Sequence, residues 1–238
     1  MTELKLIENG KRCDGRALDE MRPLYAKVGI LKNANGSAIF KIGDTVALAG
    51  VYGPREVHPR HKEEAENAIL RCTYNMAPFS TTDRNRPGPS RRSKEISLVI
   101  SRAFEPVLFL EEIPKTSIDV FIEILQANAS TRCAAINATS LALADAGIPM
   151  RDLIASCSVG KIDGQIVLDI AGKEDTEGEV DLPIAYYPKR DWITLLQMDG
   201  LITKEEFLKA IKLAKKGCMD VYKIQQQALR EKYKEVDL

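Results

Sequence analysis

Four carboxylates at alternate positions mark the stretch from 169 to 188, DIAGKEDTEGEVDLPIAYYP. They are Asp175, Glu177, Glu179 and Asp181. Side chains of an extended segment alternate between two faces, so the spacing predicts that all four share one face of a strand. Such a row suits a hard cation with oxygen ligands, Mg²⁺ or Mn²⁺, and one carboxyl could serve as a general acid. The alternative is a solvated acidic edge strand without chemistry.

Basic side chains gather between residues 84 and 94, where they are Arg84, Arg86, Arg91, Arg92 and Lys94. Ser90 is the predicted N-cap of a helix, so Arg91 and Arg92 fall in its first turn. The helix dipole disfavours cations there. An anion bound between the arginines and the helix end would explain the choice, and a solvated charge run is the alternative.

A third stretch predicts a strand, a turn and a helix in succession. Residues 117 to 125 alternate in hydrophobicity, residues 128 to 132 read NASTR, and a small-residue helix follows from 133 to 147. Backbone N–H groups at such a helix start can bind an anion, and Arg132 adds a bidentate fork. Many strand–helix turns share this pattern, so alone it is a weak signal.

Composition limits the classes of function. The 238 residues contain 34 Lys+Arg and 34 Asp+Glu, so any polyanion site must come from local clusters. The five cysteines are scattered without a CxxC pair, which favours reduced thiols over a zinc site or disulfide framework. The first residues lack an apolar signal core and no run is long enough to span a membrane, so we expect a cytoplasmic protein.

The elements that must position these groups form two blocks. The first holds a β-meander from 25 to 52, a strand from 69 to 76, and the strand and two helices described above. A composition break at 149 to 151 predicts a boundary between an N-terminal domain, 1–150, and a C-terminal domain, 151–238.

The second block begins with a hairpin, 153–161 and 165–170, and continues through the acidic strand to a strand at 192–198. It ends in a long amphipathic helix that begins with a capping box of Thr203 and Glu206. Each block therefore consists of strands followed by helix, which predicts an α+β fold.

Five motifs together resemble the RNase PH family over nearly the whole chain. They are RCDGR at 12–16, HPRH at 58–61, PSRR at 89–92, STRCAAI at 130–136 and EDTEGEVDLP at 174–183. MAPFSTTDR at 76–84 and LALADAGIPM at 141–150 are most similar to the catalytic RNase PH-like subunits of archaeal exosomes.

The resemblance implies an RNase PH-like fold, with ribosomal protein S5 domain 2-like βαβ sheets packed against helices in two strand-then-helix halves. It implies a 3′→5′ exoribonuclease that uses inorganic phosphate to release nucleoside diphosphates from single-stranded RNA. In reverse, the same site would add heteropolymeric tails to 3′ ends.

The resemblance also assigns residues. Asp181 would be the general acid, and Asp175 would hold Mg²⁺ (or Mn²⁺) with Asp181 as a second ligand. Phosphate would be bound by Arg132 and the backbone around Thr131 and Cys133, next to Ser130. The RNA would be bound by Arg60, Arg91 and Arg92. Family members usually have glycine in place of Ser130, whose side chain would narrow the phosphate site or add a hydroxyl donor.

Implied partners are single-stranded RNA, an inactive paralogous subunit in a hexameric ring built as a trimer of heterodimers, and S1/KH-type RNA-binding cap subunits. Three alternatives stay open at this point. The chain could be a non-catalytic ring subunit, a homohexameric enzyme that trims tRNA 3′ ends, or a metal-dependent hydrolase that releases nucleoside monophosphates.

Overall fold

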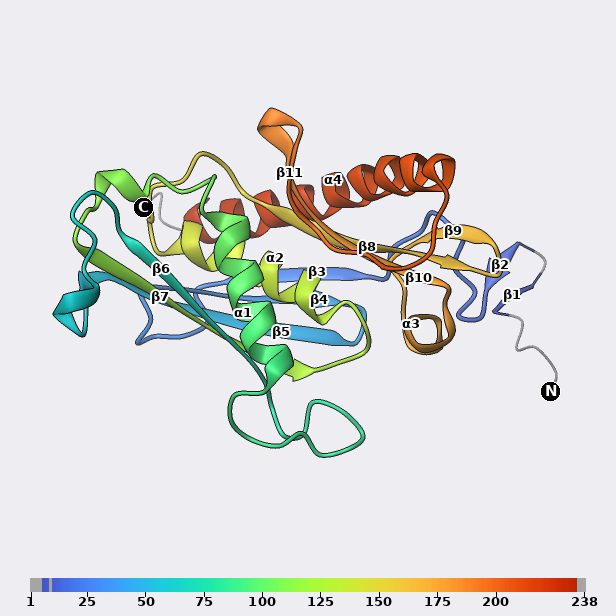
Figure 1. Cartoon of the computed structure of the whole chain (residues 1–238), viewed down its shortest axis with the longest axis horizontal. Helices are drawn as coiled ribbons and strands as arrows, with labels where there is room; N and C mark the ends of the chain where they lie inside the picture. The colour runs from blue at the N-terminus through green and yellow to red at the C-terminus, as the bar shows by residue number, and fades with distance from the viewer. Residues whose placement is uncertain (1–5, 9, 235–238) are drawn as a thin grey trace.

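The computed structural model describes residues 6–8 and 10–234 and contains two five-stranded sheets with helices packed between and beside them (Figure 1). The outermost residues of the predicted domains, 1–5 and 235–238, lie outside this range, and the boundary near 150 stays a prediction. Within the described residues, every helix is too short or too polar to cross a bilayer.

The N-terminal sheet has the strand order β3-β4-β5-β7-β6. The predicted meander forms β3 (Leu24–Val28), β4 (Gly36–Ile42) and β5 (Thr45–Glu56), all antiparallel. β7 (Thr116–Gln126) lies next to β5, and β6 (Ile69–Met76) runs parallel to β7 at the edge. A separate ribbon of β1 (Ile7–Glu8) and β2 (Lys11–Arg12) precedes the sheet.

Two helices belong to this half. α1 (Arg91–Phe104) packs on β6 and begins, as predicted, at Ser90, whose hydroxyl accepts a hydrogen bond from the Ser93 N–H in a capping box. α2 (Thr131–Asp145) begins two residues earlier than predicted. Its small side chains are almost all buried, because α2 contacts β4 and β5 on one side and β8 and α4 on the other.

The C-terminal sheet has the order β11-β10-β8-β9, and β12 also pairs with β10. Its strands are β8 (Ala155–Ile162), β9 (Gln165–Leu168), β10 (Val180–Tyr187), β11 (Trp192–Leu196) and β12 (Asp199–Gly200). The predicted hairpin is β8–β9, and the strand expected at 192–198 is β11, two residues shorter. α4 (Lys204–Lys234) lies along this sheet and begins with the predicted Thr203/Glu206 capping box.

The described residues also include three short 3₁₀ helices, at Arg60–Lys62, Leu110–Glu112 and Pro188–Arg190. One hydrophobic cluster runs through both halves, from Val28 on β3 through Ile136 on α2 to Val221 on α4. The two sheets therefore share a core, and α2 is its central element.

The prediction of one continuous acidic strand was wrong. Residues Lys173–Glu177 form a short helix, α3, and the strand begins only at Val180. Gly172, at φ +51°, starts this turn of helix, and the Gly178 N–H closes it on the Glu174 carbonyl. The four alternate carboxylates therefore do not share a strand face, and Asp175 and Asp181 come from different elements.

Candidate active site

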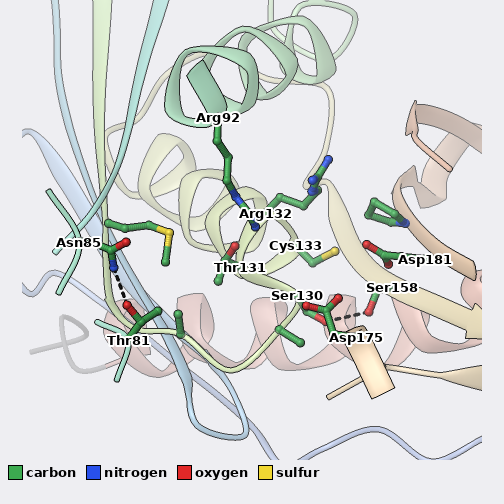
Figure 2. A pocket seen from close by; sticks show the side chains of 14 residues that line it. Thr81, Asn85, Arg92, Ser130, Thr131, Arg132, Cys133, Ser158, Asp175 and Asp181 are labelled. Carbon is green, nitrogen blue, oxygen red and sulfur yellow. Dashed lines mark hydrogen bonds between the residues drawn. The ribbon is translucent and has the colours of Figure 1, made fainter. Parts of the chain in front are cut away.

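A cleft of about 330 Å³ opens between the start of α2, the α3 turn and β10 (Figure 2). Of the nine site residues that the family resemblance implied, seven line it: Arg92, Ser130, Thr131, Arg132, Cys133, Asp175 and Asp181. They come from α1, α2, α3 and β10, so segments up to 89 residues apart in sequence meet there, as the hypothesis of a phosphate-binding catalytic site requires.

The start of α2 is shaped by a tight turn from β7. Ala129 and Ser130 both have left-handed φ values, +58° and +52°, and this reverses the chain into the helix. The Thr45 hydroxyl fixes the turn, because it accepts a hydrogen bond from the Asn128 N–H and lies within hydrogen-bonding distance of the Asn128 and Ala129 carbonyls. The first N–H groups of α2 have no carbonyl partners within the helix. Because this end of the helix borders the cleft, these N–H groups can bind an anion there.

The Ser130 side chain contacts the C-terminal sheet. Its Oγ lies 2.7 Å from the Ser158 Oγ on β8 and 3.2 Å from the carbonyl oxygen of Ile170. Both serines line the cleft. The side chain that replaces the family's usual glycine is therefore held by the C-terminal half of the chain.

Thr131 and Cys133 contribute different groups. The Thr131 hydroxyl is buried and, among the described residues, has no hydrogen-bond partner, so it can bind a ligand that enters the cleft. Burial raises the pKa of the Cys133 thiol far above its usual range. The thiol is therefore neutral, and Cys133 offers its backbone N–H rather than a thiolate.

Arg132 projects from the first turn of α2 and is only 22% exposed. Its Nη1 donates to the Oε1 of Gln197, and the Glu95 Oε1 lies 3.8 Å away. Gln197 in turn donates from Nε2 to the same Glu95 oxygen at 2.8 Å. No sequence pattern indicates Gln197 or Glu95, because neither belongs to a motif and they lie 102 residues apart.

Both aspartates line the cleft on the side of Ser130 and Ser158, Asp175 from α3 and Asp181 from β10 (Figure 2). Burial and, after it, the nearby charges of Asp175 and Asp199 together raise the pKa of Asp181 to about 6, although Arg132 acts to lower it. One oxygen of Asp181, Oδ1, is buried without a hydrogen-bond partner within the described part of the chain. A carboxyl in this setting can hold a proton near neutral pH and donate it, which is the behaviour required of a general acid.

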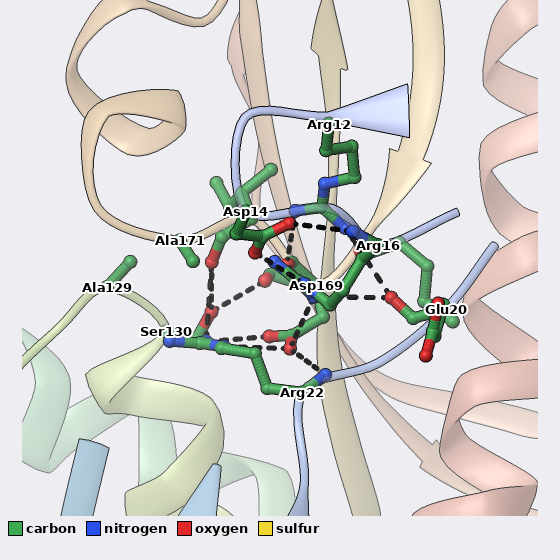
Figure 3. Close-up of polar contacts among 12 residues, drawn as sticks. Arg12, Asp14, Arg16, Glu20, Arg22, Ala129, Ser130, Asp169 and Ala171 are labelled. Atoms are coloured by element: carbon green, nitrogen blue, oxygen red, sulfur yellow. Dashed lines mark hydrogen bonds and ion pairs between the residues drawn. The ribbon is translucent and has the colours of Figure 1, made fainter. Parts of the chain in front are cut away.

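A buried ion-pair network lies beside the cleft (Figure 3). It holds in place the segment that carries Asp175 and the turn that precedes α2. Arg12 binds both carboxylate oxygens of Glu174, the residue before Asp175. Arg22 binds both oxygens of Asp169 at 2.7 and 2.8 Å and donates to the Asn128 carbonyl at 2.5 Å. The network therefore joins the N-terminal segment, the α3 turn and the turn before α2.

Sequence reasoning missed this role. RCDGR was recognised as a motif, yet nothing local indicates that Arg12 and Arg16 reach carboxylates about 150 residues away. A basic motif in a polar segment is typical of a solvated turn, and only the folded structure shows that distant carboxylates bind it.

Two predicted RNA-binding residues lie outside the cleft. Arg60 begins the short 3₁₀ helix after β5, is 85% exposed, and lies 3.8 Å from Glu56. That helix is at the opposite end of the N-terminal sheet from α3 (Figure 1). Arg91 is exposed at the start of α1. Its neighbour Arg92 lines the cleft, whereas Arg91 does not. The structure thus separates these two side chains from the catalytic candidates.

The cleft wall also includes residues to which the sequence assigned no role. Thr81 and Asn85, from the loop between β6 and α1, bind each other at 2.7 Å, and Met76 also lines the cleft. Ser158 on β8 lies on the other side, next to Ser130 (Figure 2). Within the described residues, no group of three or more His, Cys, Asp or Glu side chains is arranged to hold a metal ion. A cation here would therefore depend on Asp175, Asp181 and the ligand itself, as Mg²⁺ sites with bound phosphates commonly do.

The chain is similar to known proteins over nearly its whole length. The family model described as 3′ exoribonuclease family, domain 1, matches residues 20–149, and domain 2 of the same family matches residues 152–217. The exosome complex component Rrp41 of Pyrococcus furiosus is 62% identical over 231 residues, covering 97% of this chain and 92% of that protein. The Rrp41 component of Methanopyrus kandleri is 57% identical and covers 97% of both chains.

The fold also matches a solved structure. Rice (Oryza sativa) Rrp46 superposes with a TM-score of 0.83 at 23% identity, over 92% of this chain and all of that one.

Proposed function

The chain belongs to the RNase PH family of 3′ exoribonucleases, and from this membership and its cleft we propose that it shortens single-stranded RNA from the 3′ end by phosphorolysis. The observation that carries the proposal is that Arg132, the start of α2 and the Asp175/Asp181 pair line one cleft. Phosphoryl transfer depends on positioning and charge neutralisation, and these groups supply both without a protein nucleophile.

The reaction follows from the placement of these groups. Inorganic phosphate lies on the N–H groups of Thr131 and Cys133 and on Arg132, and one of its oxygens attacks the last phosphodiester. A new P–O bond forms and the bond to the 3′-oxygen breaks. Asp181 gives its proton to that departing oxygen. The products are a nucleoside diphosphate and an RNA one nucleotide shorter.

Two further contacts complete the proposal. Arg92, which reaches the cleft from α1, binds a phosphate near the RNA 3′ end, whereas Arg91 and Arg60 act along the path by which the RNA arrives. Mg²⁺ (or Mn²⁺), held by Asp175 with the unprotonated oxygen of Asp181 as a second ligand, would supply charge neutralisation when bound. Contacts of this kind with the RNA backbone read no base sequence.

The test uses a 5′-labelled poly(A) oligomer, Mg²⁺ and graded phosphate. We expect the rate of shortening to increase with phosphate and the product to be ADP. Asp181→Asn should lower the rate by about 10²-fold or more and leave the size of the assembly unchanged. AMP as the only product, or a rate independent of phosphate, would identify a hydrolase instead.

We also propose that the chain acts in the cytoplasm as the catalytic subunit of an exosome ring, as its Rrp41 relatives are named exosome components. Exposed apolar side chains along β11 and the segment after it support a partner surface: Trp192, Ile193, Leu196, Met198 and Leu201. A paralogous subunit would complete a ring of three heterodimers, and RNA-binding cap subunits would cover it.

Gel filtration tests the assembly. The chain expressed alone should elute below the size of a six-chain ring, and co-expression with the paralogous subunit should produce that ring. A six-chain ring formed by this chain alone would contradict the proposal and support the homohexameric, tRNA-trimming alternative.

A further inference from the structure

The Arg132 side chain is held by two residues from opposite halves of the chain. Gln197, in the segment between β11 and β12, accepts a hydrogen bond from Nη1, and Glu95 on α1 lies 3.8 Å from the same nitrogen. Gln197 also donates to Glu95 at 2.8 Å. An arginine side chain has several rotatable bonds, so without such contacts its guanidinium would sample many positions.

Gln197 is itself fixed next to the proposed acid. Its backbone N–H donates to the carbonyl of Pro183 at 3.2 Å, and Pro183 lies on β10 two residues after Asp181. Glu95 is one helical turn after Arg92 on α1. Gln197 therefore connects three elements: its side chain joins the elements of the phosphate ligand and the RNA contact, and its backbone is bonded to the strand that carries the acid.

The contact leaves the arginine able to bind an anion. A guanidinium has five N–H donors, and Gln197 takes one of them, on Nη1. The donors on Nε and Nη2 stay available for the two oxygens of a phosphate. A neutral amide also holds the guanidinium without cancelling its charge, whereas the Glu95 carboxylate stays farther from it, behind Gln197.

We propose that Gln197, supported by Glu95, is a positioning residue that presents Arg132 to the attacking phosphate. This inference rests on the proposed phosphorolytic function and adds to it a residue outside every family motif. Because Gln197 acts through Arg132, it should affect the binding of phosphate rather than the proton transfer from Asp181.

The experiment measures initial rates of poly(A) shortening against phosphate concentration, using the assembled complex. Gln197→Ala should raise the KM for phosphate about three- to tenfold and change kcat by less than about twofold. Gln197→Glu alone should also raise the KM for phosphate, since the carboxylates of residues 95 and 197 would then meet at 2.8 Å. The exchanged variant Glu95→Gln/Gln197→Glu restores donor and acceptor at the same net charge but places the carboxylate directly on Arg132, so its KM for phosphate should stay above the wild-type value.

Gln227→Ala is the matched control. Gln227 also donates to a glutamate, Glu231, at 2.7 Å, but both are exposed on α4 away from the cleft, so phosphate KM should not change. Gel filtration of each variant verifies assembly, because Gln197 lies among the exposed apolar residues that we assign to the partner surface.

The remaining outcomes separate this inference from the proposed function. An unchanged phosphate KM in Gln197→Ala would overturn the inference, and a lower KM would do the same, since it would mean that Gln197 competes with phosphate for Arg132. Arg132→Ala decides the other question. If that variant keeps the wild-type KM for phosphate, the proposed phosphate site itself is wrong.

Discussion

Ionising Asp181 destabilises the folded chain, because its carboxyl is largely buried and faces Asp175 and Asp199. Raising its pKa from 3.8 to about 6 corresponds to about 3 kcal/mol at most. The native state binds this proton more tightly than the unfolded state. The contribution of the bound proton to the free energy of unfolding is therefore fully present below pH 3.8, and it is lost as the pH rises to about 6.

Asp181→Asn should reveal this cost. The amide resembles the protonated carboxyl, so the variant and the wild-type chain should have similar free energies of unfolding near pH 4. At pH 8 the variant should be more stable by up to about 3 kcal/mol. Urea unfolding with a metal chelator present measures both values. Equal stability at both pH values would mean that Asp181 is well solvated.

At the same scale, Ser130 shows what the sequence could and could not predict. The resemblance identified it as a departure from glycine and left two consequences open, a narrower site or an extra hydroxyl. The structure shows the hydroxyl against Ser158, 28 residues later, and the backbone at φ +52°. Neither fact could be predicted locally, because the first requires the packing of β8 and the second a strained conformation that serine rarely adopts.

At the scale of elements, hydrophobic periodicity predicted most strands and the long helix. β7 was recognised because Ile118, Val120, Ile122 and Ile124 alternate and are all buried. α3 was missed because five residues are too few for a helical pattern, and its alternate carboxylates also fit a strand. What makes this segment helical is the turn at Gly172 and the buried contact of Glu174 with Arg12.

The buried network between elements makes a prediction of its own. Arg22→Met would leave Asp169 with the longer contact to Arg16, 3.2 Å, as its remaining ion pair among the described residues. We expect a loss of about 3 kcal/mol in the free energy of unfolding, because a buried charge loses its main partner. Adding Asp169→Asn should recover part of that loss, since the unpaired charge is then removed.

Lys216→Met is the control for this pair. Lys216 binds Asp19 at 2.6 Å, but the two side chains are 56% and 59% exposed, so its removal should leave the free energy of unfolding nearly unchanged. Chemical denaturation of the three variants decides the question. An Arg22→Met chain as stable as Lys216→Met would show that the network does not hold the two halves together.

At the scale of the whole molecule, the shared core bears on the predicted division into 1–150 and 151–238. α2 belongs to the first segment by sequence, yet it packs against β8, β10 and α4 of the second. Its residues are buried on both sides, including Cys133, Ile136 and Leu141. Removing the second segment would therefore expose to water one side of a helix whose side chains are almost all buried in the intact chain.

The two segments should for this reason fold together rather than separately. A fragment of residues 1–150 should show no cooperative thermal transition by calorimetry and should aggregate through α2, whereas the intact chain should unfold in a single transition. Co-expression of 1–150 with 151–238 should restore the transition, since the nick falls between α2 and β8 and breaks no hydrogen bond of either sheet. A cooperative transition in 1–150 alone would show that the first sheet and α2 are an independent domain. The cleft, whose acid and phosphate groups come from both segments, would then depend on docking rather than on one folding unit.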